Sequence, residues 1–485
     1  MAKRKSKEST KQKISIFSWI VFAILIIVSA ITGSIVLSMK IVPAKYIIPL
    51  GIVYILILIG IGFVIFQKKF KNWLKILMSV ISIIFIAGLS FGLYYLNSTL
   101  HFMNEIRSKD YQIEEYYVMV LNNSEYKKLK DLEDQTLGTY KSITDHYSDA
   151  LDKLSSKVRT EEKEYDSYIE ASQALMDGKV EAILLSAAYK SIVDDEIENF
   201  DTKTRILDTI QIRIKNEVET KEADVTNESF NIYISGIDIY GDISLVSRSD
   251  VNMIITVNPK THQVLLTSIP RDYYVQLHGT AGYRDKLTHA GIYGIDMSVQ
   301  TLEDLFGIDI NYYVRVNFTT LINLVDAIGG IDVFSDATFT SYTNSTCKFQ
   351  YGTNHLGGKC ALAFSRERYA YKEGDRHRIQ NQQDVLKAIL NKALSSKTLI
   401  TKYTSILESL GSSFQTSVPT SKIYELVNMQ LDSMPNWNIE QISVNGSDKH
   451  DYTYSYSAQK LYVMEPDMST VHTAQQKIAE VMKGE

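Results

Sequence analysis

The chain is poor in cysteine and proline, and one long stretch contains no acidic residue. Two cysteines in 485 residues are too few for a disulfide-dense scaffold or a four-cysteine zinc site. No Asp or Glu occurs between Ile14 and Leu96, and no proline occurs in residues 107–228. Hydrophobic residues at 45% and charged residues at 22% exclude wholesale disorder. The length exceeds that of one ordinary domain, so we expect two or three structural units.

Charge divides the chain into two parts of opposite sign. Residues 1–106 carry twelve Lys or Arg and two acids, Glu8 and Glu105, a balance of +10. The whole chain has 51 basic and 56 acidic residues, which leaves 39 and 54 in residues 107–485, a balance of −15. Phosphate backbones repel an acidic part of this size, so the composition disfavours DNA as a partner.

Three apolar stretches lie in the part without acids, at about Ile14–Met39, Tyr46–Phe66 and Ile76–Leu96. Each has the roughly 20 residues that a helix needs to cross about 30 Å of hydrocarbon. A cleaved signal peptide would have one short apolar run, and an amphipathic core helix would show polar residues every three or four positions. The sequence therefore predicts a three-helix membrane anchor over residues 14–106.

The basic residues between the apolar stretches predict the orientation of the anchor. Six precede the first stretch, four separate the second from the third, and only Lys40 and Lys45 lie in the first connection. The positive-inside rule then places a basic tail, residues 1–13, and the 67–75 connection in the cytoplasm. We expect a multi-pass protein of the cell membrane whose large C-terminal part, from about residue 97, is extracellular.

The part expected outside the cell divides into two regions with different sequence patterns. Residues 107–228 predict a small accessory α/β domain, with a helix over Tyr168–Asp177 that ends at Gly178 and a strand over Val180–Leu185. Residues 229–485 predict a larger α/β/α sandwich domain, a central mixed sheet with helices on both faces. Its expected strands are Phe230–Asp238, Met253–Val257, Val264–Ile269, Asn311–Val316 and Ile331–Phe334, and its expected helices are Asp296–Phe306, Phe318–Ile328, Gln380–Leu394, Tyr403–Leu410 and Ser421–Leu431.

Two carboxylates are predicted at the adjoining ends of neighbouring strands. Asp238 ends one strand, and Asp250, preceded by Arg248, begins the next. Both can face one point outside the sheet, where a hard cation such as Mg²⁺ takes one or two carboxylates together with phosphate oxygens. The alternative is a surface Asp–Arg pair and an Asp in a turn.

Basic residues gather in two further clusters. Arg271 stands where a strand ends, and Lys286 lies in a Gly-rich connection expected to be mobile; each alone is more often a solvated charge. Residues 359–378 hold six basic residues against three acids. Arg366 and Arg368 would point the same way on an extended segment, and Arg378 and Gln382 share one face of the following helix. Converging guanidinium groups suit a pyrophosphate, and a solvated basic patch is the alternative.

Five ordered motifs resemble the LytR-CpsA-Psr family of Gram-positive cell-wall enzymes. They read SGIDIYGD…SRSDVNMIITVNP, TSIPRDYYV, DKLTHAG, HLGGKCALAFSRERY and GDRHRIQNQQ, within residues 230–480. The three-span anchor and the extra outer domain resemble the capsule-operon branch of that family, the CpsA type of streptococci.

The resemblance implies a membrane-anchored transferase that moves a capsular glycopolymer from a polyprenyl-pyrophosphate lipid to peptidoglycan. Asp238 and Asp250 match the positions that bind Mg²⁺, with Mn²⁺ as a possible substitute. Arg271 and Arg366 join them as catalytic residues. The pyrophosphate-binding positions fall on Arg248, Arg271, Lys286, Arg366, Arg368, Asp375, Arg378 and Gln382. The implied partners are the lipid-linked glycan, the peptidoglycan acceptor, the membrane and other capsule-assembly proteins.

Two other functions stay open at this point. A membrane-bound regulator of capsule expression would have to act through a 13-residue cytoplasmic tail and one short loop, which have no room for a helix-turn-helix. A receptor for polyprenyl phosphate or glycan would use the same arginines without turnover. Cys347 and Cys360 are either two separate small apolar residues or a disulfide closing a loop of about 14 residues, worth roughly 3 kcal/mol; the bond is the favoured alternative.

Overall fold

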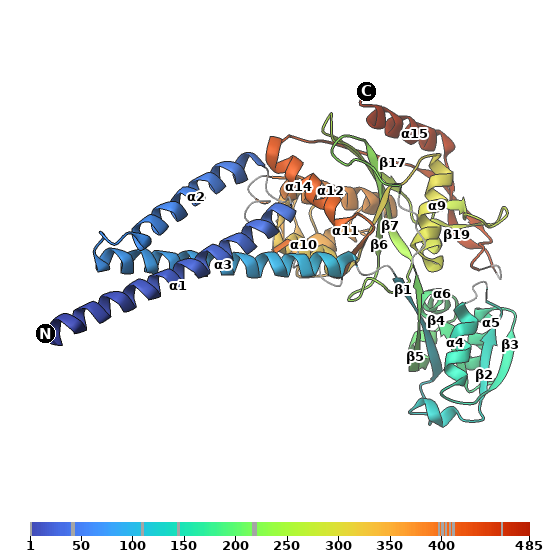
Figure 1. Ribbon diagram of the computed structural model, residues 1–485. Helices are drawn as coiled ribbons and strands as arrows, with labels where there is room; N and C mark the ends of the chain where they lie inside the picture. Colours follow the sequence, from blue (N-terminus) through green and yellow to red (C-terminus); the bar gives the residue numbers. More distant parts are fainter. Residues whose placement is uncertain are drawn as a thin grey trace.

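The computed structural model describes residues 2–485 except 40–43, 108–110, 143–145, 216–220, 396–397, 399–401, 403–404, 407–408, 410–412 and 457–458. Three long N-terminal helices are followed by two α/β parts, each built on a mixed sheet (Figure 1). This is the predicted fold class. The domain boundaries at 106/107 and 228/229 stay a prediction, and the helix predicted over Tyr403–Leu410 falls largely outside the described residues.

The three N-terminal helices have the length and apolarity of membrane spans. They are α1 (Ala2–Met39), α2 (Ala44–Phe66) and α3 (Asn72–Arg107), and their apolar segments are 25, 22 and 23 residues long. Most of their large apolar side chains are exposed, while a few, such as Leu25 and Ile65, pack between the helices. Apolar surface of this extent is stable where lipid covers it, which makes the three helices a membrane anchor.

The anchor contacts the second α/β part near the connection between α1 and α2. Lys45 Nζ lies 3.2 Å from Asp432 Oδ1, near the end of α14 (Thr420–Ser433). Helix α3 packs against α14 and against strand β16 (Phe414–Thr416). The first residues of α2 and the helix α3 therefore lie against the second α/β part.

The first α/β part has a five-stranded mixed sheet in the order β3-β2-β4-β1-β5. Strand β2 is parallel to β3 and β4, and β1 is antiparallel to β4 and β5. Helix α5 ends before Gly178, whose φ of +67° fits its predicted place just past the helix. The elements are β1 (Tyr111–Leu121), η1 (Leu129–Leu132), β2 (Thr136–Tyr140), α4 (His146–Ser155), β3 (Glu161–Tyr165), α5 (Tyr168–Met176), β4 (Ala182–Ser186), α6 (Ala187–Glu196), α7 (Phe200–Lys203) and β5 (Thr204–Lys215).

The second α/β part has a six-stranded mixed sheet in the order β16-β11-β6-β7-β8-β17. Side chains alternate along β7, so that Ile254 packs toward α9 and α15 while Met253 and Ile255 pack on the opposite face, toward α12. Figure 1 shows α9 and α15 on one side of the sheet and α10, α11 and α12 on the other. The sheet and its helices are β6 (Phe230–Ile237), β7 (Ser249–Asn258), β8 (Gln263–Ile269), α8 (Leu287–Ala290), α9 (Ile295–Phe306), β11 (Tyr312–Val316), α10 (Phe318–Ala327), α11 (Gly358–Ser365), α12 (Asp375–Ala393), β17 (Asn438–Ser443) and α15 (Met468–Lys483).

Small two-stranded sheets surround this core. Strand β9 (Tyr274–Gln276) pairs with β10 (Arg284–Lys286), and β12 (Ile331–Ser335) pairs with β15 (Gly352–Leu356). The remaining pairs are β13 (Phe339–Thr340) with β14 (Lys348–Phe349) and β18 (Gly446–Asp451) with β19 (Leu461–Pro466). Cys347 and Cys360 form a disulfide that ties the residues after β13 to α11, which is the alternative that the sequence favoured.

The two α/β parts are joined by backbone hydrogen bonds. The N–H of Ile113 in β1 donates to the carbonyl of Ser244 (2.7 Å), and the N–H of Val246 donates to the carbonyl of Ile113 (2.8 Å). The hydroxyl of Tyr168 also donates to the carbonyl of Ser455 (3.0 Å). Strand β1 thus pairs with the loop that links β6 to β7, at Leu245.

The predicted orientation of the anchor can be tested by thiol labelling, because both native cysteines are bonded to each other. We expect a cysteine at Lys372→Cys, in the second α/β part, to react with a membrane-impermeant maleimide on intact cells. A cysteine at Lys68→Cys, between α2 and α3, should react only after the membrane is opened. The opposite labelling pattern would show that the large part faces the cytoplasm.

Candidate active site

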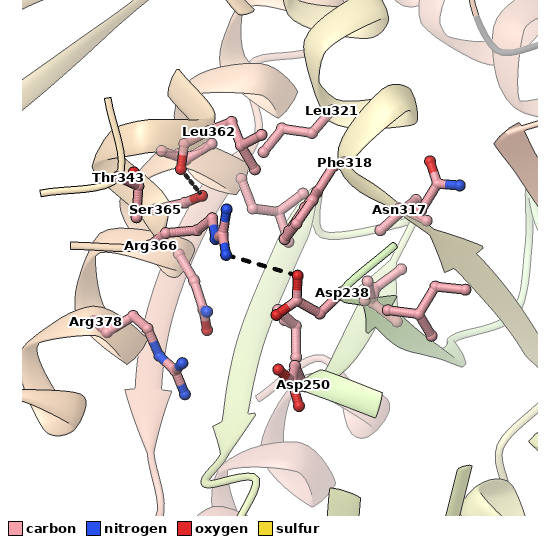
Figure 2. A pocket seen from close by; sticks show the side chains of 18 of the residues that line it. Asp238, Asp250, Asn317, Phe318, Leu321, Thr343, Leu362, Ser365, Arg366 and Arg378 are labelled. Carbon is pink, nitrogen blue, oxygen red and sulfur yellow. Dashed lines mark hydrogen bonds and ion pairs between the residues drawn. The ribbon is translucent and has the colours of Figure 1, made fainter. Parts of the chain in front are cut away.

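The antiparallel pairing of β6 and β7 brings Asp238 and Asp250 together. Asp238 directly follows β6, Asp250 is the second residue of β7, and Ile237 lies opposite Ser249 across the ladder. The strands approach so closely that a Cβ on Gly236 would stand 2.7 Å from the Cβ of Val251, which only glycine avoids. Figure 2 shows the two carboxylates one above the other on the same wall of a cavity.

That cavity has a volume of about 330 Å³ and lies between strands β6 and β7 and helices α10, α11 and α12. Its lining has two kinds of side chain. Apolar groups come from the sheet and from all three helices: Ile234, Met253, Leu321, Leu362, Val385, Leu386 and Ile389. Its charged and polar groups include Asp238, Asp250, Arg366, Arg368, Arg378 and Gln382. Figure 2 shows Arg366 and Arg378 on the side of the cavity that faces the two carboxylates.

Asp250 is the more buried of the two carboxylates. Its Oδ2 accepts a hydrogen bond from Arg271 Nη1 (3.0 Å), and its Oδ1 accepts one from the hydroxyl of Thr288 (3.1 Å). Burial alone would raise the pKa of Asp250, but the charges of Arg271, Arg248 and Arg378 and the bond from Thr288 lower it below the usual value. Asp250 is therefore held ionised.

Asp238 is more open and has the opposite shift. Its side chain is 43% exposed, and its Oδ1 lies 3.7 Å from Arg366 Nη2. Burial and the neighbouring Asp250 carboxylate raise the pKa of Asp238 above its usual value, against the lowering effect of Arg366, Arg248 and Arg271. The guanidinium of Arg366 also lies over the ring of Phe318, 4.3 Å from its centroid, which orients it toward the cavity.

Arg368 and Arg378 share one carboxylate, that of Asp375. Arg378 Nη2 lies 2.9 Å and Arg368 Nε lies 3.3 Å from Asp375 Oδ1. Burial, together with the charges of Arg271 and Arg368, lowers the pKa of Arg378 to about 10, although Asp375 opposes the shift. The buried Nε of Arg378 has no hydrogen-bond partner among the described residues, so a donor remains for an anion in the cavity. Arg378 and Gln382 line the cavity from the same face of α12, as their spacing predicts.

Four predicted site residues do not line the cavity: Asp375, which holds Arg368 and Arg378, and the residues Arg248, Arg271 and Lys286. Arg271 contacts Asp250 and Asp272 (3.4 Å), and Lys286 Nζ lies 3.2 Å from Asp272 Oδ1. Arg248 does not line the cavity, but its charge acts on both carboxylates. Arg271 and Lys286 therefore reach the cavity through other charged side chains.

Two local expectations are wrong. Lys286 was expected in a mobile Gly-rich connection, but it is the last residue of β10 and is paired with Tyr274 of β9. Arg366 was expected on an extended segment, but it caps the C-terminus of α11 with helical φ and ψ of −102° and −6°. Arg366 and Arg368 therefore face the same cavity because the chain bends after α11, and not because they alternate along a strand.

Residues that the sequence did not single out complete the site. Thr288 bonds Asp250, Asp272 holds both Arg271 and Lys286, and Phe318 supports Arg366. Thr288 and Asp272 lie inside the quoted motifs next to predicted residues, which is a signal that could have found them. Phe318 looks like an ordinary first residue of a helix.

The donor set around the carboxylates fits a divalent cation that is bound together with phosphate. Two carboxylates at neighbouring strand ends suit Mg²⁺, whose other positions are filled by phosphate oxygens and water. In the described part of the chain, no three His, Cys, Asp or Glu side chains are arranged to hold a metal. A cation here would thus depend on the ligand for much of its coordination.

Replacement of Arg366 should distinguish an anion site from a solvated basic patch. We predict that Arg366→Ala weakens binding of inorganic pyrophosphate about ten- to a hundred-fold, since a charge-assisted hydrogen bond contributes roughly 1.5–3 kcal/mol. Arg366→Lys should restore binding only in part, because an ammonium presents no planar fork. Calorimetry on the full-length protein at constant ionic strength measures the pyrophosphate affinity of both variants.

Lys372→Ala provides the matched control for Arg366→Ala. Lys372 is exposed on the same segment and does not line the cavity, so its loss should cost less than about 0.5 kcal/mol. Arg368→Ala should behave like Arg366→Ala, and Arg378→Ala should also lower stability because its side chain is buried. Equal, small losses at Arg366 and Lys372 would contradict the anion site.

The opposite pKa shifts of the two carboxylates predict opposite effects on stability. The fold favours ionised Asp250, whose contribution is present above its unfolded pKa of about 3.9 and is lost as the pH falls through the lower folded value. The fold disfavours ionised Asp238. At pH 7 without divalent cations, Asp250→Asn should lower the denaturant midpoint, and Asp238→Asn should leave it unchanged or raise it.

Asp152→Asn is the control for this pair, because Asp152 is exposed on α4 in the first α/β part and does not line the cavity. The denaturant midpoint of this control variant should equal that of the wild-type protein. A larger loss of stability for Asp238→Asn than for Asp250→Asn would reverse the assignment of the two environments.

Known families and proteins resemble the chain in this region. The model of the LytR_cpsA_psr family matches residues 198–477, which is more than half of the chain and contains every predicted site residue. A model of DNA polymerase processivity factors matches residues 68–185, less than half of the chain, a range that includes the apolar helix α3. The second match is too short to show a family.

Curated relatives and solved structures match the same C-terminal region. The teichoic acid transferase TagU of Bacillus cereus strain AH820 is 34% identical over 245 residues, covering 50% of this chain and 78% of TagU. TagU of Oceanobacillus iheyensis is 34% identical over 227 residues, covering 45% and 68%. Among structures, B. subtilis TagV is 29% identical with a TM-score of 0.46, covering 53% of this chain and 98% of TagV. B. subtilis TagT is 26% identical with a TM-score of 0.44, covering 55% and 95%.

The family model spans the sheet, the helices and the charged cavity, and a relative with 34% identity is matched over most of its own length. The motifs quoted from the sequence lie within the matched range and contain the two carboxylates and the arginines that line the cavity. This chain belongs to the LytR_cpsA_psr family.

Proposed function

We propose that this chain transfers a glycopolymer from a polyisoprenyl-pyrophosphate carrier to peptidoglycan on the outer face of the cell membrane. The observation that carries the proposal is one cavity in which apolar side chains from the sheet and three helices adjoin two carboxylates and three arginines. A prenyl chain requires the first kind of lining and a pyrophosphate requires the second. The printed names of the TagU relatives, polyisoprenyl-teichoic acid–peptidoglycan teichoic acid transferases, support the same class of reaction.

The proposal gives each charged residue a role. Arg366, Arg368 and Arg378 bind the pyrophosphate oxygens, and Arg271 keeps Asp250 ionised and in place. Asp238 and Asp250 would hold Mg²⁺, which supplies Lewis-acid stabilisation of phosphate charge when it is bound. A wall-sugar hydroxyl attacks the glycan-side phosphorus and forms a new P–O bond. The P–O bond to the bridging oxygen breaks, the lipid phosphate leaves with the electron pair, and the hydroxyl proton passes to water.

The arginines lower the barrier because they are already in place when the charge develops on the lipid phosphate. Arg366 is held by Phe318 and Asp238, and Arg378 and Arg368 are held by Asp375. Preorganised donors of this kind need no reorganisation at the moment of reaction.

We further propose a capsular polysaccharide as the glycan. The support is the arrangement of three apolar helices and a first α/β part ahead of the family domain, which resembles the capsule-operon branch. Comparison of transfer from a capsule-type donor and from a teichoic-acid-type donor on the same carrier separates the two substrates.

Reconstitution tests the proposed reaction directly. The full-length protein in liposomes, given polyprenyl-pyrophosphate glycan, Mg²⁺ and peptidoglycan, should attach glycan to peptidoglycan. Asp238→Asn and Asp250→Asn should each lower the rate by about a hundred-fold or more, as loss of a preorganised charged group does. The control Asp152→Asn should keep the wild-type rate. Saturable donor binding without any transfer would instead indicate a receptor.

A further inference from the structure

Two tyrosine rings stand at the exposed rim of the cavity. Tyr342 and Tyr369 both line it, yet their residues are 72% and 71% exposed. Their ring centroids lie 4.4 Å apart, with the ring planes inclined at 53°. Aromatic surface left open beside a charged site marks a contact surface for a ligand.

A buried carboxylate fixes the backbone on both sides of this tyrosine pair. Glu367 is 1% exposed, and its Oε2 accepts the N–H of Tyr342 (3.0 Å). Its Oε1 accepts the N–H groups of Arg368 (3.1 Å), Tyr369 (2.9 Å) and Ala370 (3.2 Å). One side chain thus ties together two segments that are far apart in the sequence, and it belongs to the turn that carries the phosphate-binding arginines.

The loop of Tyr342 is also held at its other end. The N–H of Ser341 donates to the carbonyl of Cys347 (3.0 Å), and Cys347 is bonded to Cys360 in α11. Figure 2 shows Thr343 of this loop beside Ser365 and Arg366. The two rings are therefore preorganised next to the arginine, which lowers the entropy cost of binding a ligand.

The position of the rings defines the chemistry of their ligand. Whatever they contact lies at the exposed rim of the cavity that Arg366 and Arg368 also line, where a phosphate would bind. A pyranose ring offers a face of polarised C–H groups to the electron-rich face of an aromatic ring, while its hydroxyls stay in water. We infer that Tyr342 and Tyr369 form a subsite for a pyranose sugar adjacent to the pyrophosphate, an inference that rests on the proposed function.

The sugar can come from two sources, the first residue of the donor glycan or the acceptor strand, and binding experiments separate them. The probes are geranyl pyrophosphate, the same lipid bearing N-acetylglucosamine on its pyrophosphate, and a soluble peptidoglycan disaccharide. Calorimetry on the full-length protein in detergent should show that Tyr342→Ala and Tyr369→Ala each weaken binding of one sugar-bearing probe by about two- to ten-fold. Affinity for geranyl pyrophosphate should stay within about two-fold of wild type.

Conservative and matched variants exclude a merely structural role. Tyr342→Phe and Tyr369→Phe keep the ring and should keep most of the affinity for the sugar-bearing probe. Tyr342→Leu and Tyr369→Leu should lose it. Tyr351→Ala is the control, because Tyr351 is 71% exposed and packs on Phe334 but does not line the cavity. It should leave all three affinities unchanged.

The outcomes separate this subsite from the proposed function. A loss confined to the lipid-linked sugar assigns the subsite to the donor, and a loss confined to the disaccharide assigns it to the acceptor. The subsite would be overturned if the tyrosine variants lost no affinity, or lost it equally for probes with and without sugar. It would also be overturned if they lost only binding to sugar-free liposomes, which would indicate a membrane contact instead. Failure of wild-type protein to bind geranyl pyrophosphate would count against the proposed function, whatever the tyrosine variants do.

Discussion

The buried carboxylate of Asp250 holds the charged half of the site together. Its side chain is 13% exposed, and an ion so buried is stable only where cations and hydrogen bonds replace the lost water. Arg271 and Thr288 supply those bonds, while Asp272 holds Arg271 and Lys286 in turn. Loss of one partner would leave a buried charge uncompensated. The fold therefore has to bring four elements together around Asp250: the start of β7, the end of β8, β10 and α8.

The same balance of charge explains how three arginines can line a cavity that also has apolar walls. Each has a carboxylate or a ring beside it: Arg366 has Asp238 and Phe318, and Arg368 and Arg378 share Asp375. The pairs are incomplete, since Asp238 stays 43% exposed and the buried Nε of Arg378 lacks a partner among the described residues. The network thus balances much of its own charge and still offers donors to an anion, which a fully paired network would not do.

Short-range patterns predicted the parts of the site that lie on regular elements. Alternation along β6 and β7 placed Asp238 and Asp250 at adjoining strand ends, and the 3.6-residue period placed Arg378 and Gln382 on one face of α12. The roles of Glu367 and Tyr342 could not be found in this way, because they depend on a buried carboxylate that bonds two distant loops. Lys286 was misplaced for a related reason: its glycine-rich surroundings suggested a loop, but pairing with β9 makes them a hairpin.

Strand β1 of the first α/β part bonds directly to the loop between the two carboxylates. Ile113 of β1 exchanges two backbone hydrogen bonds with the loop that runs from Asp238 to Asp250, on either side of Leu245. The carbonyl of Leu245 accepts a hydrogen bond from Arg315 (3.1 Å), a side chain buried beneath the loop that also bonds Gln415 (2.9 Å). Since α3 ends at Arg107 and β1 begins at Tyr111, the strand that bonds this loop starts four residues after the end of the anchor. The distance of the carboxylates from the anchor is therefore set by paired backbone, and a shift of β1 would reach Asp238 and Asp250 through the loop between them.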